Sequence, residues 1–348
     1  MERFRTVETQ NMISTSNDQC NLNTPMPVIA ASYLGPSLVP NQDAAWDEAK
    51  LPLNPDDLVL KIMGQPMRRA GRFIKLVCCG ALTCFQSVPK ETLQAQKVGI
   101  FLATGLGNID EILPFITQVF KHDGGFPSPN QFANSVSNAA AFFLARVCGV
   151  KGVVLTISQE ELSFESALWL AQSYLAAGEI DLALVGGCDV FTPTIEDYRE
   201  RIDLKPGHYR VAPMGEGSSW LLMGGNGEKK IGDILSVDLE SSLTEMQETS
   251  SDYLLKQCEG LAAGLLSQGE DQKISRLLLP GFRLSGIDET LWKTRGWDID
   301  DYLPHCGISS TASAYGLARA LLSRKSTLIV HCNHHATGRQ ALVATVTK

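Results

Sequence analysis

Long apolar runs are missing from this sequence. No stretch of the 348-residue chain approaches the roughly 20 apolar residues that a membrane-spanning helix requires. Residues 1–24 are polar and include acidic side chains, so they do not resemble a signal peptide and are expected to form a polar N-terminal tail. We therefore expect a cytoplasmic protein without a membrane span.

A basic excess is missing as well. Lysine and arginine number 30 against 38 aspartates and glutamates, which gives a formal net charge of -8. No basic stripe is available to pair with phosphates, and this argues against nucleic acid as a partner.

No CxxC pair occurs, so the sequence predicts no zinc site, and it suggests no cofactor. Seven of the nine cysteines lie in apolar or small-residue surroundings and are expected to be small core residues: Cys78, Cys79, Cys84, Cys148, Cys188, Cys306 and Cys332. The doublet His334-His335 does not change the expectation of no metal, because adjacent residues on a strand point to opposite sides.

Hydrophobic patterning predicts an α/β protein. Apolar residues make up 44% of the chain, and its length suits one large domain or two fused halves. Apolar runs without alternation are typical of strands buried on both faces, and they occur at residues 28–31, 98–103, 153–157 and 182–185. Helical spacing occurs at residues 68–85, 109–120, 134–148 and 163–177.

One segment occurs twice. The small-residue helix at 166–171 precedes a buried strand at 182–185, and a similar helix at 313–318 precedes an apolar strand at 328–330. This repetition suggests an internally duplicated α/β architecture.

Five segments, in the same order and at similar spacing, resemble the β-ketoacyl synthases of fatty acid and polyketide assembly. They are Arg68-Arg69-Ala70-Gly71-Arg72-Phe73, the run from Pro129 to Ala140, Gly149-Val150-Lys151-Gly152, the run from Gly178 to Gly187, and Gly215-Glu216-Gly217. The resemblance implies the thiolase-like fold, an α/β fold with duplicated βαβ halves in a five-layer αβαβα arrangement. We expect an N-terminal half at 25–230 and a shortened C-terminal half at 231–348.

The resemblance also implies a dimer, in which the strand at 153–157 pairs with its mate in the partner. Residues expected at that interface or along an acyl tunnel are Phe132, Asn134, Asn138, Phe142, Phe143, Val153, Leu155 and Ile157. Phe142 and Phe143 have an alternative interpretation as core aromatics.

The nucleophile of the family is not found. A condensing synthase needs a cysteine thiolate where a strand turns into a helix, because a soft, readily ionised sulfur forms and releases a thioester easily. Counting forward from Gly152 and backward from Gly186, both without gaps, places Glu161 at that position. No cysteine lies between Cys148 and Cys188. A glutamate suits a helix start, and we interpret Glu161 as structural rather than catalytic.

The two catalytic histidines of the family are also not matched. Pro280 stands at the position of the first, and Gly307 at that of the second, with His305 two residues away. A loop shift would allow His305 to serve, but a structural histidine is the favoured interpretation.

Three functions remain open. The first is a non-condensing subunit, similar to chain-length factors, that forms a heterodimer with an active ketosynthase and limits acyl length. The second is an enzyme with altered chemistry, a decarboxylase or acyltransferase acting on acyl- or malonyl-carrier substrates through Glu161 or His305. The third is a homodimeric scaffold that binds acyl chains.

The early basic segment has two interpretations. Arg68, Arg69 and Arg72 either dock an acidic carrier protein or form a solvated helix face.

Overall fold

The computed structural model describes most of the chain outside the N-terminal tail. The described residues are 24–45, 51–94, 96–121, 128–192, 212–225, 229–240, 251–266, 274–284, 287–335 and 338–348. The tail predicted at residues 1–24 lies outside them apart from its last residue.

Ten strands form one continuous sheet in the order β3-β2-β4-β5-β1-β6-β10-β9-β7-β8. The strands of its first half are β1 (Met26–Leu34), β2 (Val98–Ala103), β3 (Val154–Ile157), β4 (Leu182–Asp189) and β5 (Gly217–Gly224). Those of its second half are β6 (Gly232–Glu240), β7 (Ser275–Pro280), β8 (Trp297–Ile299), β9 (Thr327–His334) and β10 (Gln340–Thr347).

The two halves repeat one topology. Strand order 3-2-4-5-1 in the first half becomes 8-7-9-10-6 in the second, which is the same order with each number raised by five. β2 runs parallel to β3 and β4, and β7 runs parallel to β8 and β9. β5 and β10 are each antiparallel to both neighbours. The predicted duplication is confirmed.

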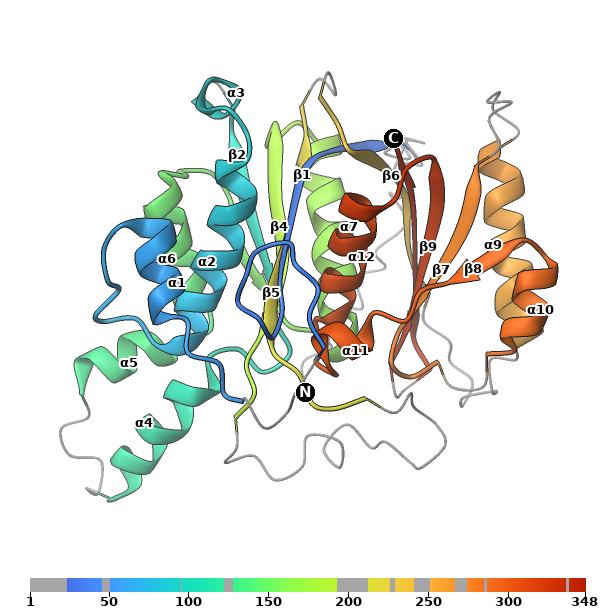
Figure 1. Cartoon of the computed structure of the whole chain (residues 1–348). Coiled ribbons are helices and arrows are strands. Elements are labelled where there is room, and N and C mark those ends of the chain that lie inside the picture. Colours follow the sequence, from blue (N-terminus) through green and yellow to red (C-terminus); the bar gives the residue numbers. More distant parts are fainter. Residues whose placement is uncertain are drawn as a thin grey trace, which may run out of the picture.

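Helices complete five layers (Figure 1). α7 (Ser163–Ala176) and α12 (Ala312–Ser323) lie between the two halves of the sheet, because α7 contacts β4 and β6 while α12 contacts β5 and β9. The first half is covered by α1 (Asp56–Met63), α2 (Arg72–Gln86) and α6 (Ala139–Cys148), and the second by α9 (Ser251–Leu266) and α10 (Glu289–Thr294). The predicted αβαβα arrangement is confirmed.

Five further helices lie within the described residues. They are α3 (Lys90–Gln94), α4 (Ile109–Lys121), α5 (Pro129–Ser135), η2 (Glu160–Leu162) and α11 (Leu303–Cys306). In the part of the chain that the structure describes, no helix combines the length and the apolar character needed to cross a bilayer.

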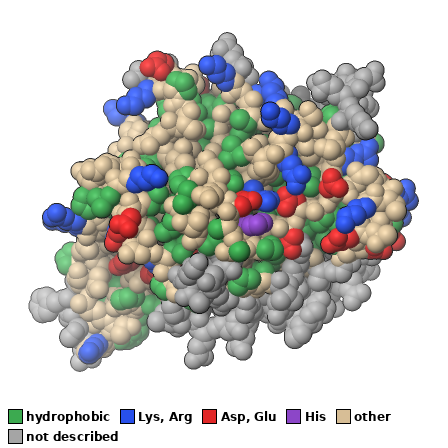
Figure 2. All heavy atoms as spheres, in the orientation of Figure 1, with side chains coloured by type: hydrophobic (Ala, Val, Ile, Leu, Met, Phe, Trp, Pro, Cys, Tyr) green, Lys and Arg blue, Asp and Glu red, His purple; other side chains and the backbone are tan. Residues whose placement is uncertain are grey.

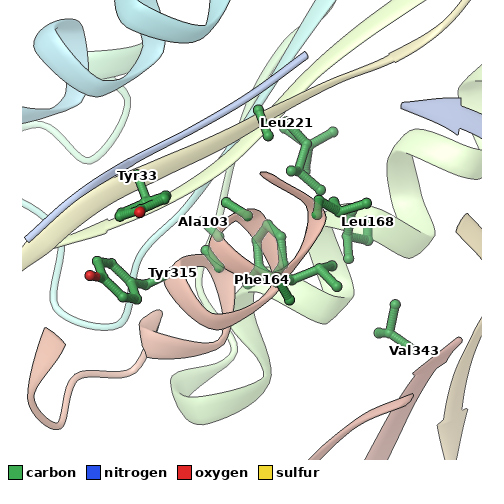
Figure 3. Packing of buried hydrophobic residues seen from close by; sticks show 14 of the residues in the cluster. Tyr33, Ala103, Phe164, Leu168, Leu221, Tyr315 and Val343 are labelled. Carbon is green, nitrogen blue, oxygen red and sulfur yellow. The ribbon is translucent and has the colours of Figure 1, made fainter. Parts of the chain in front are cut away.

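The central core lies between the two halves and involves both repeat helices. Figure 3 shows Phe164 and Leu168 of α7 packed among strand residues, with Tyr315 of α12 facing Tyr33 of β1. The two tyrosine rings meet edge to face with centroids 4.9 Å apart. Small residues permit this close packing, since a Cβ placed on Gly187 would lie 2.6 Å from the side chain of Thr311.

The structure corrects several predicted boundaries. The helix predicted at 134–148 is two helices, α5 and α6, because Val136 takes an extended conformation and ends α5. α2 begins at Arg72 rather than at 68, with Gly71 as its extended N-cap. β3 begins at Val154, one residue later than predicted.

Candidate functional site

A tight turn connects β3 to α7 and positions Glu161. The 3-10 turn η2 follows the strand and leads directly into the helix. Ser163 holds the turn together, because its hydroxyl accepts a hydrogen bond from the Gln159 N–H at 2.9 Å and donates to the Glu160 carbonyl at 2.6 Å. Glu160 has a φ of 50°, in the left-handed region, which turns the chain sharply before Glu161. Glu161 thus stands at a strand-to-helix elbow.

The Glu161 carboxylate is buried and paired with Arg283. Only 2% of its side chain is exposed, and its Oε1 accepts a hydrogen bond from Arg283 Nη2 at 2.8 Å. Its Oε2 lies 3.3 Å from His335 Nε2. Asn333 Nδ2 donates to the Glu161 backbone carbonyl at 2.7 Å. A guanidinium and a carboxylate paired in this way form a charge-assisted hydrogen bond, which is stronger than one between neutral groups.

Arg283 is a site residue that was not predicted from the sequence. It lies in the turn after β7, three residues beyond Pro280, which ends that strand without supplying an imidazole. A guanidinium from this loop therefore reaches the elbow. Arg283 stands between Phe282 and Leu284 in no recognisable motif, so its contact with Glu161 could not be predicted from the sequence.

His335 brings a third group to the elbow. Its Nε2 contacts a carboxylate oxygen of Glu160 directly and lies beside Glu161. The donor atoms of the three residues all lie within 4.8 Å of one another. His334 points away from them and approaches Gln340 Oε1 at 3.1 Å, as expected for neighbouring residues at a strand end. The sequence indicated the doublet but not that the second histidine meets two glutamates.

A second buried group lies behind the elbow. Asn333 Nδ2 also donates to Glu165 Oε1 at 3.1 Å, and that oxygen lies 3.9 Å from His331 Nδ1. His331 Nε2 is 3.3 Å from the Tyr302 hydroxyl. Burial raises the pKa of Glu165 to about 7 and lowers the pKa of His331 to about 3. Both side chains are therefore held neutral in mildly acidic solution.

His305 lies in a different place. It sits on α11, and its Nδ1 is 3.3 Å from the backbone carbonyl of Ala44, beside Asp43. Within the described part of the chain, His305 contacts Ala44 and Asp43 and does not contact Glu161. The histidine beside Glu161 is His335.

Two comparisons with known proteins found similarity to β-ketoacyl synthases. Residues 45–196 match the model of the β-ketoacyl synthase N-terminal domain. The match covers the elbow and Glu161. No match was found among curated proteins in a sequence search.

Solved ketosynthase structures share the fold along nearly the whole chain. The ishigamide ketosynthase/chain length factor superposes with a TM-score of 0.70 at 13% identity, covering 93% of this chain and 99% of that one. A type II polyketide synthase acyl-carrier protein in complex with its ketosynthase bound to the hexaketide (AntDE:AntF, apo) gives 0.66 at 12% identity, covering 94% and 100%. The oxazolomycin ketosynthase domain OzmH KS7 of Streptomyces albus JA3453 gives 0.65 at 12% identity, covering 93% and 75%.

The residues predicted along the ketosynthase interface or tunnel occupy different environments. Phe142 is 61% exposed and Phe132 is 56% exposed, so neither is a core aromatic. Phe143 packs against the outer core of the first half. Asn138 is exposed at the start of α6, and Asn134 is buried. The aliphatic residues of the edge segment are half-buried against the central core, and they are Val153, Leu155 and Ile157.

The three arginines of the ketosynthase-like motif divide into two groups. Arg72 pairs with Asp110 and with the buried Glu216 of the Gly-Glu-Gly turn. Glu216 also accepts hydrogen bonds from the Leu53 and Phe191 N–H groups at 2.6 and 2.7 Å. Arg72 is therefore a structural anchor between distant loops. Arg68 and Arg69 are exposed.

The described cysteines do not offer a substitute nucleophile. Seven are buried and Cys148 is half-buried, while Cys20 lies outside the described residues. Burial raises the pKa of the thiols, to about 12 for Cys79, Cys148 and Cys258 and well above the usual range for Cys188 and Cys332. A thiol that stays protonated is a poor nucleophile.

A hollow of about 380 Å³, including the solvent at its mouth, lies among the loops that follow β2 and β4 and those that precede β5 and α12. Residues from four loops line it, among them Leu106, Phe191, Met214 and Ile308. Asp189 at its edge connects two of these loops, because it accepts hydrogen bonds from the Gly105 and Thr311 N–H groups. Glu161 and His335 are not among the lining residues, so this hollow and the elbow are distinct places.

Proposed function

We propose that the protein is a non-condensing subunit of chain-length-factor type that pairs with an active ketosynthase. One observation carries the proposal: a buried carboxylate, ion-paired with Arg283, occupies the strand-to-helix elbow, to which the sequence resemblance assigns the family's cysteine. A carboxylate does not form a stable thioester adduct, so an acyl chain cannot be held covalently at Glu161. We place the pair in the cytoplasm, in fatty acid, polyketide or aryl-polyene biosynthesis.

Electrostatics support the loss of condensing chemistry. Condensation requires decarboxylation of a malonyl group, which brings a second carboxylate close to the elbow. Glu161 and Glu160 would both repel that carboxylate if they were charged. Arg283 already pairs with Glu161 and so offers less compensation to an incoming anion.

An unpaired sheet edge and apolar side chains support pairing with another subunit. β3 is the outermost strand of its half of the sheet, and an uncovered edge strand is a template for pairing. Exposed apolar residues occur on α4, α5 and α6 and in the turn between the last two, and they are Ile116, Phe120, Phe132, Val136, Phe142 and Val147. In Figure 2, green side chains reach the surface on the left and lower left, where these helices lie. The similar solved structures include a ketosynthase/chain length factor and a ketosynthase complex with its acyl-carrier protein.

Co-expression with a cysteine-bearing ketosynthase tests the proposal. We expect the two chains to co-purify as a heterodimer, and Phe142→Asp to weaken that association because it places a charge in an apolar interface. Tyr253→Asp is the matched control, because Tyr253 is 54% exposed on α9 at the opposite side of the molecule. A stable monomer that co-purifies with no cysteine-bearing ketosynthase would refute the proposal. A homodimer would favour an acyl-binding scaffold.

The contact between His335 and Glu161 favours one alternative function, an enzyme with altered acid–base chemistry on acyl- or malonyl-carrier substrates. The original candidates for this role were Glu161 and His305. Turnover of malonyl-carrier protein that falls in Glu161→Gln and His335→Asn, but not in His305→Asn, would support chemistry at the elbow. Equal turnover in all three variants would end this alternative.

A further inference from the structure

We propose that Glu160, Glu161 and His335 bind a divalent transition-metal ion at the elbow. The three residues come from two segments that are 175 residues apart in the sequence, yet their donor atoms lie within 4.8 Å of one another. One imidazole nitrogen and two carboxylates thus lie close enough together to share one ion. This arrangement does not depend on whether the chain pairs with a ketosynthase.

The donor set indicates the class of ion. Imidazole nitrogen suits zinc, iron, cobalt and other first-row divalent ions, whereas calcium and magnesium prefer oxygen ligands alone. Three protein ligands of the His/Glu type are the usual number at a zinc site that keeps one position open. The cluster therefore fits Zn²⁺ or an ion of similar preference, such as Co²⁺.

An unsatisfied buried oxygen is the second observation that points to a ligand. Glu161 Oε2 is buried and accepts no hydrogen bond from the described residues. Arg283 takes the other oxygen, Oε1, and leaves Oε2 directed toward His335. A buried carboxylate oxygen that accepts no hydrogen bond is costly even with an imidazole 3.3 Å away, and a coordinated cation would satisfy it.

The surroundings would hold the ligands in place and admit an ion. Asn333 donates a hydrogen bond to the backbone carbonyl of Glu161, and the His335 backbone N–H donates to the Arg339 carbonyl at 2.9 Å. Such supporting contacts orient metal ligands. The Glu160 side chain is 68% exposed, whereas those of Glu161 and His335 are 2% and 6% exposed. The site is thus accessible to solvent at Glu160 and buried at Glu161 and His335.

Charge balance favours the same ion. Two glutamates and Arg283 give the cluster a net charge of about -1 when His335 is neutral, so a divalent cation is attracted rather than repelled. A protonated His335 bridging both glutamates is the rival arrangement. It uses the same contacts and binds no metal, so a binding measurement separates the two.

The test is titration of the purified full-length chain, stripped of metal and kept reduced, with Zn²⁺ by calorimetry and with Co²⁺ by visible absorption. We expect one ion per chain and a Co²⁺ spectrum typical of a four- or five-coordinate site. Glu161→Gln and His335→Asn should each weaken binding by at least about tenfold, as loss of a ligand does. Glu160→Gln should weaken it too, and this exposed residue can be changed without disturbing the core.

His305→Asn is the matched control, because His305 lies on α11 beside Ala44, and the variant should bind as the parent does. Retained binding in all three ligand variants, or loss in His305→Asn alone, would overturn the proposal. No binding of either ion by the parent chain at millimolar metal would overturn it as well and would favour the protonated His335 bridge.

Discussion

Removing Arg283 should destabilise the protein by leaving a buried carboxylate without its partner. The two side chains are 8% and 2% exposed, and the Nη2–Oε1 distance is 2.8 Å. Breaking a buried ion pair at one end costs about 3–5 kcal/mol. His335 lies 3.3 Å from the other carboxylate oxygen and offers partial compensation, which places Arg283→Met near the lower limit, about 3 kcal/mol.

Urea unfolding followed by circular dichroism measures this cost, and a double-mutant cycle assigns it to the pair. Glu161→Gln in the Arg283→Met background removes the orphaned charge, so the double variant should regain about 1–3 kcal/mol. Lys293→Met is the control, because Lys293 and Glu289 form an exposed pair with 61% and 64% of their side chains exposed. Its cost should stay below about 1 kcal/mol. An Arg283→Met variant no less stable than Lys293→Met would refute the reasoning.

Two further predictions concern the core. Burial raises the pKa of Glu165 from 4.5 to about 7, so its contribution to stability is full below pH 4.5 and is lost as the pH rises through about 7. Glu165→Gln should therefore stabilise the protein by about 3 kcal/mol at alkaline pH and by little at acidic pH; a pH-independent effect in urea unfolding would contradict this. Gly186→Ala should lower the melting temperature, because its Cβ would lie 2.1 Å from Trp220. Gly260→Ala in α9, where a Cβ meets nothing within 4 Å, should raise it slightly, and the opposite order would contradict the packing.

The buried strands and the repeat helices could be predicted from the sequence. The run at 98–103 lacks alternation because β2 is covered on both faces, and its predicted bounds match those observed. The repeated small-residue segments became α7 and α12, which occupy equivalent positions after β3 and β8. The small-residue pattern of these helices could be recognised in the sequence, because close packing of two central helices restricts the size of their side chains.

Other features depend on contacts that no local pattern encodes. The break between α5 and α6 arises from the extended backbone of Val136, a residue that helices also tolerate. The second half of the sheet was predicted only through its helix–strand copy, and the proposed division of the chain near residue 230 stays a prediction.

At the elbow, the position of Glu161 could be predicted from the sequence, whereas the residues that contact it could not. Glu161 could be placed by counting along the chain, because spacing on both sides is a local property. Its partners could not, since Arg283 and His335 reach it from loops that are distant in sequence and adjacent only after both halves have folded. His305 was a candidate because of its position in the sequence, whereas the structure places it beside Ala44.

Intact-mass spectrometry tests the central claim most directly. The purified chain, paired with a cysteine-bearing ketosynthase, is incubated with acyl-carrier protein loaded with an acyl thioester. We predict that the partner gains the acyl mass while this chain keeps its own mass unchanged, because a paired carboxylate stands at Glu161 instead of a thiolate. A stable acyl adduct on any cysteine of this chain would contradict the account.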